Sequence, residues 1–159
     1  MTSPIRPTDD EARQLARNLM QTARYGALAV LDPQSRAPLV SRIAVVPGPD
    51  GLPLSLVSDL AAHTAALKAD PRCSLMVGEP GDKGDPLTHP RLSLQGRARF
   101  IRHADAEHGA LAAHYLTLQP KAKLYISFGD FALMRLTLTG AFLNGGFGKA
   151  FFLTPDDLT

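Results

Sequence analysis

The stretch Pro38–Val77, PLVSRIAVVPGPDGLPLSLVSDLAAHTAALKADPRCSLMV, decides the fold. It holds three apolar runs, a turn rich in Gly and Pro between the first two, and an Ala-rich segment before the third. The apolar runs have the composition and alternation of strands, and Asp70-Pro71 ends a short helix expected over 62–69. Because tight turns join neighbouring strands, we expect antiparallel pairing.

Arg42 lies at the centre of the first apolar run, Leu39 to Pro47, in which seven of nine residues are apolar. We therefore expect this strand to be well buried. A buried guanidinium keeps its charge and needs an anionic partner. The spacing alone favours a structural ion pair, or a long side chain that reaches solvent, over a bound ligand.

The segment Ser58-Asp59-Leu60-Ala61-Ala62-His63-Thr64 opens the short helix. A helix N-terminus offers free amides and the positive end of the helix dipole, which together bind phosphates. The hydroxyls of Ser58 and Thr64 would add donors. Ordinary capping by Ser, Asp or Thr is the simpler explanation of the same residues.

The remaining elements surround this stretch. A capping box beginning at Thr8 predicts an amphipathic helix over 9–22, and Gly96 predicts a bulge or a close approach within a long strand. Further strands are expected at 25–31, 92–101, 132–143 and 149–153, and further helical segments at 104–116 and 119–125. About seven or eight short strands with peripheral helices predict a mostly β, antiparallel barrel.

Composition restricts the class of protein. The 159 residues suit one domain, and their 45% hydrophobic and 20% charged content suits a globular core. A formal net charge of +2 without a Lys/Arg block does not suggest a nucleic-acid partner. No stretch has the length of a membrane span and none forms a signal peptide, so we expect no membrane partner and a cytoplasmic location.

The candidate redox and metal residues are few. Cys73 is the single cysteine, which excludes an internal disulfide, and its apolar neighbours predict a buried structural thiol. His103, His108 and His114 are five and six residues apart, which is poor spacing for a shared helix face, so no metal site is expected. We expect Asp156-Asp157 to form a solvated tail.

The order of the segments resembles the pyridoxamine 5′-phosphate oxidase-like family of FMN-binding split barrels. The segments that carry this resemblance are Tyr25–Ala29, Ser41-Arg42-Ile43, Ser58–Thr64, Asp70–Leu75 and Pro90–Ala98. Two others, Phe128-Gly129-Asp130-Phe131 and Asn144–Ala150, resemble its heme-utilisation (HugZ-like) branch.

The resemblance implies an antiparallel split β-barrel and a homodimer that binds FMN at the subunit interface. Arg42 would bind the FMN phosphate, so the resemblance reverses the preference for a structural ion pair. The other residues matched to the FMN site are Ser58, His63 and Thr64 around the phosphate, Ser41 and Ile43 beside the isoalloxazine ring, and Arg91 and Gln95 on the strand that approaches from the partner.

These expectations lead to an FMN-binding flavoprotein, a small oxidoreductase of unknown substrate in which no residue has an assigned catalytic role. The chain has no Trp, and the C-terminal Arg- and Trp-containing segment of true pyridoxamine phosphate oxidases has no counterpart, so vitamin B6 oxidation is not expected. One alternative is a heme-binding or heme-degrading protein, and another is a non-catalytic FMN carrier or sensor. Long strands at 92–101 and 132–143 would supply the dimer interface.

Overall fold

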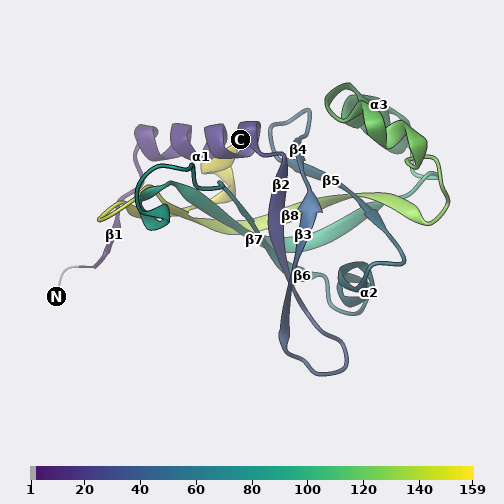
Figure 1. The fold of residues 1–159 in the computed structure, drawn as a ribbon, viewed down its shortest axis with the longest axis horizontal. Coiled ribbons are helices and arrows are strands. Elements are labelled where there is room, and N and C mark those ends of the chain that lie inside the picture. Colours follow the sequence, from purple (N-terminus) through teal and green to yellow (C-terminus); the bar gives the residue numbers. More distant parts are fainter. Residues whose placement is uncertain (1–2) are drawn as a thin grey trace.

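A computed structural model describes residues 3–159 (Figure 1). The strands are β1 (Ile5–Arg6), β2 (Tyr25–Leu31), β3 (Pro38–Ala44), β4 (Val46–Pro47), β5 (Pro53–Ser58), β6 (Arg72–Val77), β7 (Arg91–Ile101), β8 (Phe131–Asn144) and β9 (Ala150–Leu153). The α-helices are α1 (Asp10–Thr22), α2 (Ala62–Ala69), α3 (His108–Leu118) and α4 (Pro155–Leu158), and short 3-10 helices cover Pro86–Thr88 and Pro120–Leu124.

The strands form one nine-stranded sheet whose main path is β1-β9-β8-β7-β6-β2-β3. All pairings are antiparallel except that of β1 with β9. The long strand β8 pairs with β7 along one edge, while its other edge pairs first with β5 and then with β9. The predicted mostly β fold with peripheral helices is confirmed.

The sheet curls toward a barrel but does not close. Strand β3 hydrogen-bonds only to β2 within residues 3–159. Past Ala44 the chain continues as β4, which pairs with β5 through Val46↔Leu54 and Pro47↔Pro53. The β4–β5 hairpin therefore joins the two sides at one end, and β3 and β5 separate beyond it. We call this separation the split, and it is the feature expected of a split barrel.

Two groups of buried side chains stabilise the fold. The larger one fills the barrel and includes Ala12, Ala16 and Met20, by which α1 covers it. The smaller one packs α3 against β5 and β8 through residues such as Leu111, Tyr115 and Leu133. In Figure 1 α1 and α3 lie above the sheet, while the β2–β3 hairpin and α2 lie below it. Within residues 3–159 no helix combines the length and apolar character needed to cross a membrane.

Both ends of the chain differ from the sequence-based expectation. Helix α1 is capped by Asp9, whose carboxylate accepts the Ala12 amide at 2.8 Å, rather than by Thr8. Asp157 is not part of a solvated tail, because it closes a capping box in α4 and pairs with Arg13 at 2.7 Å. That ion pair joins residues 144 positions apart, which no local pattern can reveal.

The other predicted elements are present with small shifts of their ends. Helix α3 begins at His108 instead of 104, because residues 104–107 form a turn. The expectation of a well-buried strand around Arg42 is wrong for β3, whose residues alternate between exposed and less exposed positions. The strand lies at the end of the sheet path, with one face uncovered. Apolar content alone could not show that only one face is covered.

Gly96 has both predicted features, a bulge and a close approach. The β7–β8 register shifts at Gln95/Gly96, because Gln95 pairs with Gly140 and Gly96 with Leu138, which leaves Thr139 as the extra residue. A Cβ atom built on Gly96 would lie 2.3 Å from the carbonyl oxygen of Thr137. The backbones of the two longest strands therefore meet where only hydrogen fits.

We expect Gly96→Ala to lower the free energy of unfolding by about 1–3 kcal/mol, the usual cost of overpacking. Urea unfolding measures the change. Gly109→Ala is the matched control, since a Cβ there meets nothing within 4 Å and Ala favours helix α3. Equal effects of the two substitutions would contradict the close approach.

Candidate functional site

The N-terminus of α2 has no side-chain cap. Its N-cap residue is Ala61, so neither Ser58 nor Asp59 caps the helix, and no other side chain does. The amides of Ala62 and His63 have no backbone acceptor within residues 3–159. Ordinary capping, the simpler explanation of this sequence, is therefore absent. Unsatisfied amides and the helix dipole leave this end suited to an anion.

Two side chains in the first turn of α2 carry buried polar atoms without partners. Thr64 is 1% exposed, and its Oγ1 has no hydrogen-bond partner in the described chain. The Nε2 atom of half-buried His63 also has none, and burial lowers the pKa of this imidazole. Buried polar atoms are normally satisfied, so these two exceptions point to a group that the protein chain does not supply.

Arg42 is exposed on the outer face of β3, where its guanidinium carbon lies 5.3 Å from the centre of the Tyr25 ring. Within residues 3–159 it forms no ion pair. The structural ion pair considered from the sequence is thus absent within the described chain. Because Arg42 lies on an exposed strand face, water can solvate its charge and no protein partner is needed. Its charge remains available to an external anion.

Ser58 and Arg42 lie on opposite sides of the split. Continuing the β4–β5 register, in which Val46 is level with Leu54, would bring Arg42 level with Ser58. The Ser58 hydroxyl is already engaged, because it donates to Asp130 at 3.2 Å and accepts the Leu60 amide at 3.1 Å. The Ser58 hydroxyl therefore stabilises the turn before α2 through hydrogen bonds inside the protein.

The other predicted residues lie on two different faces of the sheet. Ile43 points inward and is buried, and Ser41 shares its face, so their side chains point away from that of Arg42. Arg91 and Gln95 are on β7, three strands away from β3 in the sheet path. Arg91 donates to the carbonyl oxygens of Leu87 and His89 at 3.0 and 3.2 Å. One protomer therefore does not bring all eight residues together.

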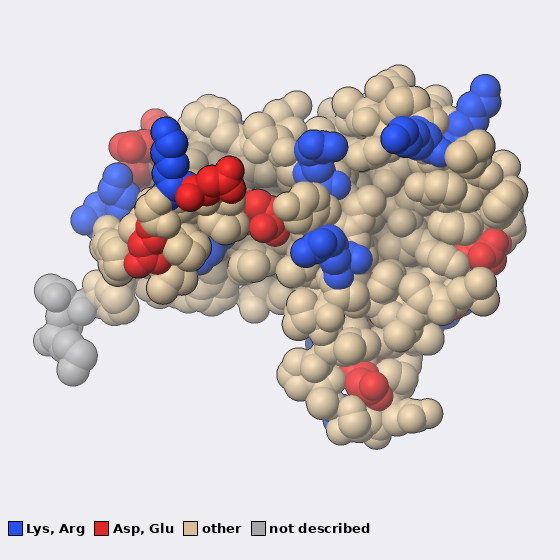
Figure 2. All heavy atoms as spheres, in the orientation of Figure 1, with Lys and Arg blue, Asp and Glu red and all other residues tan. Residues whose placement is uncertain are grey.

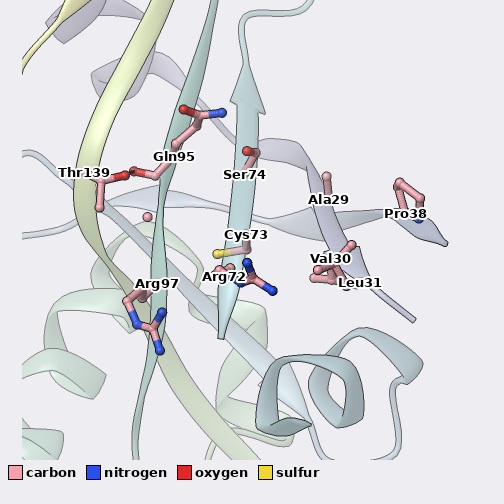
Figure 3. A pocket seen from close by; sticks show the side chains of 11 residues that line it. Ala29, Val30, Leu31, Pro38, Arg72, Cys73, Ser74, Gln95, Arg97 and Thr139 are labelled. Atoms are coloured by element: carbon pink, nitrogen blue, oxygen red, sulfur yellow. Dashed lines mark hydrogen bonds between the residues drawn. The ribbon is translucent and has the colours of Figure 1, made fainter. Parts of the chain in front are cut away.

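Gln95 lines a hollow on the outer sheet face, a depression of about 460 Å³. Figure 3 shows Gln95 and Ser74 toward one end of it and the side chains of Arg72 and Arg97 toward the other. These two arginines are direct cross-strand partners, and of the two Arg72 has an acidic partner within residues 3–159, Asp70 at 2.6 Å. Neither was predicted as a lining residue, because local patterns do not establish the pairing of β6 with β7.

Cys73 also borders this hollow and behaves as the sequence predicted. It is 9% exposed, and burial raises the pKa of its thiol to about 11. The thiol therefore stays protonated near neutral pH and is a poor nucleophile. The structure confirms a buried structural cysteine.

Three of the other four histidines form hydrogen bonds to the backbone, and the fourth, His108, is buried with an Nε2 atom that has no partner within residues 3–159. The Nε2 atoms of His103 and His114 lie 3.1 and 2.8 Å from the carbonyl oxygens of Ile126 and Pro47. His108 is 9% exposed, and its ring centre is 4.4 Å from that of His103. Within residues 3–159, His, Cys, Asp and Glu form no group of three or more that could hold a metal ion.

Comparisons with known proteins connect this geometry to a family. The family described as pyridoxamine 5′-phosphate oxidase matches residues 12–144. A solved heme-binding protein from Mycobacterium smegmatis is 31% identical with a TM-score of 0.82, and the match covers 97% of this chain and 61% of that one. A protein of unknown function from Agrobacterium tumefaciens is 37% identical with a TM-score of 0.80, covering 99% and 65%.

A curated relative, the chloroplastic non-canonical heme oxygenase HOZ of Arabidopsis thaliana, is 40% identical over 88 residues. The match covers 55% of this chain and a quarter of that protein. These comparisons confirm the resemblance to the heme-utilisation branch. Since the family match extends over most of the residues, from α1 to the end of β8, the chain belongs to the pyridoxamine 5′-phosphate oxidase family.

Proposed function

We propose that the protein is an FMN-binding flavoprotein that holds the FMN phosphate at the split, between Arg42 and the N-terminus of α2. The observation that carries this proposal is the pair of unsatisfied buried atoms, Thr64 Oγ1 and His63 Nε2, at an uncapped helix end. A phosphate oxygen would satisfy a hydroxyl and free amides together. Family membership supports the choice of FMN among phosphate-bearing ligands.

The charges of the residues present suit such a phosphate. Among residues 3–159 no acidic side chain pairs with the Arg42 guanidinium, and the long Arg42 side chain could turn from Tyr25 toward the split. A guanidinium can bind a phosphate through two parallel hydrogen bonds. The neutral His63 ring contributes a polar nitrogen without a second buried charge.

The isoalloxazine ring would lie along the outer edge of β3, beside Ser41 and Ile43. This edge lacks a neighbouring strand within the described chain, so its backbone groups are free to bind the polar rim of a flavin. When bound, FMN supplies the redox chemistry, and the protein binds and orients it. We propose a small oxidoreductase whose substrate is unknown; a carrier or sensor would share the same binding site.

The site would be completed by a second copy of the chain. Across the outer sheet face one row of paired residues runs through Arg42, Ala27, Met76, Ser93, Phe142 and Phe152. The side chains of Met76, Phe142 and Phe152 are 41–48% exposed, and the two phenylalanine rings lie 4.1 Å apart. Apart from Arg42 and Ser93 the row is apolar, and exposed apolar side chains that gather on one sheet face are typical of an interface. We propose a homodimer in which Arg91 and Gln95 of one protomer approach the FMN bound by the other.

Changes at Arg42 test the phosphate assignment. We expect Arg42→Lys and Arg42→Ala to weaken FMN binding about ten- to a hundredfold, because a hydrogen bond to a charged group contributes roughly 1.5–3 kcal/mol. Riboflavin lacks the phosphate and should respond little. Quenching of flavin fluorescence measures both ligands. Equal losses for FMN and riboflavin would contradict a role in phosphate binding.

Thr64→Val tests whether the Thr64 hydroxyl binds the ligand, because it separates ligand affinity from the stability of the ligand-free protein. The substitution removes a hydroxyl that has no partner in the ligand-free chain, so the unfolding free energy should not fall. FMN affinity should nevertheless fall. A variant that loses stability without ligand, or that binds FMN as well as wild type, would argue against Thr64 as a ligand group.

The dimer can be tested on the apolar row. We expect wild type to be a dimer at micromolar concentration by light scattering, and Phe142→Glu to be a monomer because it places a charge in the interface. Leu124→Glu is the control, since Leu124 is 78% exposed and lies outside the sheet. A monomeric wild type, or a dimeric Phe142→Glu variant, would overturn the proposed assembly.

Heme binding is the second candidate function. Two relatives are named as a heme-binding protein and a heme oxygenase, and both share at least 30% identity with this chain. A heme iron can be held by a single imidazole nitrogen. His63 is the better candidate because its ring is partly exposed and its Nε2 has no partner within residues 3–159. The Nε2 atoms of the three histidines His89, His103 and His114 contact backbone carbonyls, and His108 is almost fully buried.

A heme titration separates the two functions. If heme is the ligand, a Soret band should appear, should be lost in His63→Ala, and should persist in His114→Ala. If FMN is the ligand, heme should not displace it. A Soret band that is the same in wild type and in both variants would exclude His63 as the iron ligand.

A further inference from the structure

Asp59 is an unexpected residue in a turn that leads to a phosphate site. A carboxylate so close to the N-terminus of α2 would repel an anionic ligand. Its oxygens, however, accept hydrogen bonds from both terminal nitrogens of Arg102, at 2.8 and 3.0 Å. Lys68, near the end of α2, pairs with the same carboxylate at 2.8 Å. Two cations therefore neutralise Asp59 and hold it in a defined place.

The same turn is also fixed through its backbone. The Asp59 amide donates to the carbonyl oxygen of Asp130 at 2.7 Å, and the Ala61 amide donates to that of Ser58 at 3.1 Å. Asp130 precedes β8, and Arg102 follows β7. The turn is thus attached to the ends of two strands that pair with each other along their length.

Arg102 is itself held in place. Its backbone amide donates to the Asp105 carboxylate at 2.7 Å, and its guanidinium carbon lies 5.4 Å from the centre of the Phe100 ring. Its side chain is 32% exposed and that of Asp59 is 29% exposed, so solvent only partly screens the pair. Because Arg102 and Asp59 are both restricted and share two hydrogen bonds, their contact fixes the orientation of the Asp59 side chain.

We propose that Arg102 and Asp59 are positioning residues, which orient the turn 58–61 and so aim the free end of α2 at the ligand phosphate. This inference rests on the proposed FMN function. Neither residue touches the ligand in this account. Lys68 shares the neutralisation but comes from α2 itself, so it cannot anchor the helix to the sheet as Arg102 does.

The ionisation of Asp59 supports a permanent contact. Hydrogen bonds from Arg102, and then from Lys68, lower the pKa of this carboxyl to about 2. Asp59 therefore remains charged even near pH 4, where an ordinary Asp carboxyl with a pKa of about 3.9 is half protonated. The positioning contact should not respond to pH near neutrality.

The first test compares flavin affinities in the full-length protein. Arg102→Gln should raise the Kd for FMN about tenfold, by analogy with the lower end of the loss that follows when a residue orienting a metal ligand is removed. The Kd for riboflavin should stay within about twofold, a change under half a kcal/mol. Arg99→Gln is the matched control, because Arg99 lies on β7, three residues before Arg102, and pairs with Glu107 rather than with the turn.

Asp59→Asn separates positioning from simple charge. The substitution removes a negative charge, which by itself would strengthen FMN binding, but it also weakens the contact with Arg102. Positioning predicts weaker FMN binding and faster amide exchange in residues 58–64 of the ligand-free protein. Tighter FMN binding by Asp59→Asn, or unchanged exchange in both variants, would overturn the inference.

The outcomes also separate this inference from the proposed function. If wild type binds no FMN, the proposed function fails and the positioning role fails with it. If wild type binds FMN more tightly than riboflavin and Arg102→Gln matches wild type for both ligands, only the positioning role fails. Equal losses for FMN and riboflavin in Arg102→Gln would indicate a merely structural pair and would also overturn it.

Discussion

Strand β3 pairs with β2 on one edge and leaves its other edge without a strand partner in the described chain. This constraint determines much of the functional architecture. Because β4, not β3, continues the sheet to β5, the barrel closes at one end and opens at the other. The opening lies between the free edge of β3 and the end of β5, where α2 begins. A closed ladder at this point would remove both the free backbone edge and the access to α2.

The distribution of charge around the split follows from the same arrangement. Within residues 3–159 Arg42 forms no ion pair, while at the turn before α2 Asp59 is paired with two cations and Asp130 accepts the Ser58 hydroxyl. The local balance therefore favours an added anion, although the whole chain has a formal charge of only +2. Figure 2 shows cationic and anionic side chains interspersed over the visible face, without one broad basic area. A local site for one anionic group fits this surface better than an extended polyanion does.

Local patterns predicted the parts of this fold that local physics determines. Alternation marked β7, the Ala-rich segment before Asp70-Pro71 marked α2, and Gly96 marked the bulge. Long-range contacts were beyond such patterns. The pairing of Asp59 with Arg102 joins residues 43 positions apart, and β1 pairs with a strand at the other end of the chain.

The candidate site was predicted in part for the same reason. The residue types around α2 suggested an anion site, but only the structure showed that Ala61 occupies the cap position and that Thr64 is buried without a partner. Arg42 was expected to be buried, because counting apolar residues does not reveal which face of a strand is covered. Its exposure makes it more accessible to a ligand than the sequence had indicated.

The central claim is that the split binds a phosphate group as part of a flavin. The most direct measurement is a calorimetric titration of wild-type protein with FMN and, separately, with riboflavin. We expect FMN to bind at least about tenfold more tightly than riboflavin, a difference near 1.4 kcal/mol. Equal affinities for the two flavins, or no binding of FMN, would contradict it.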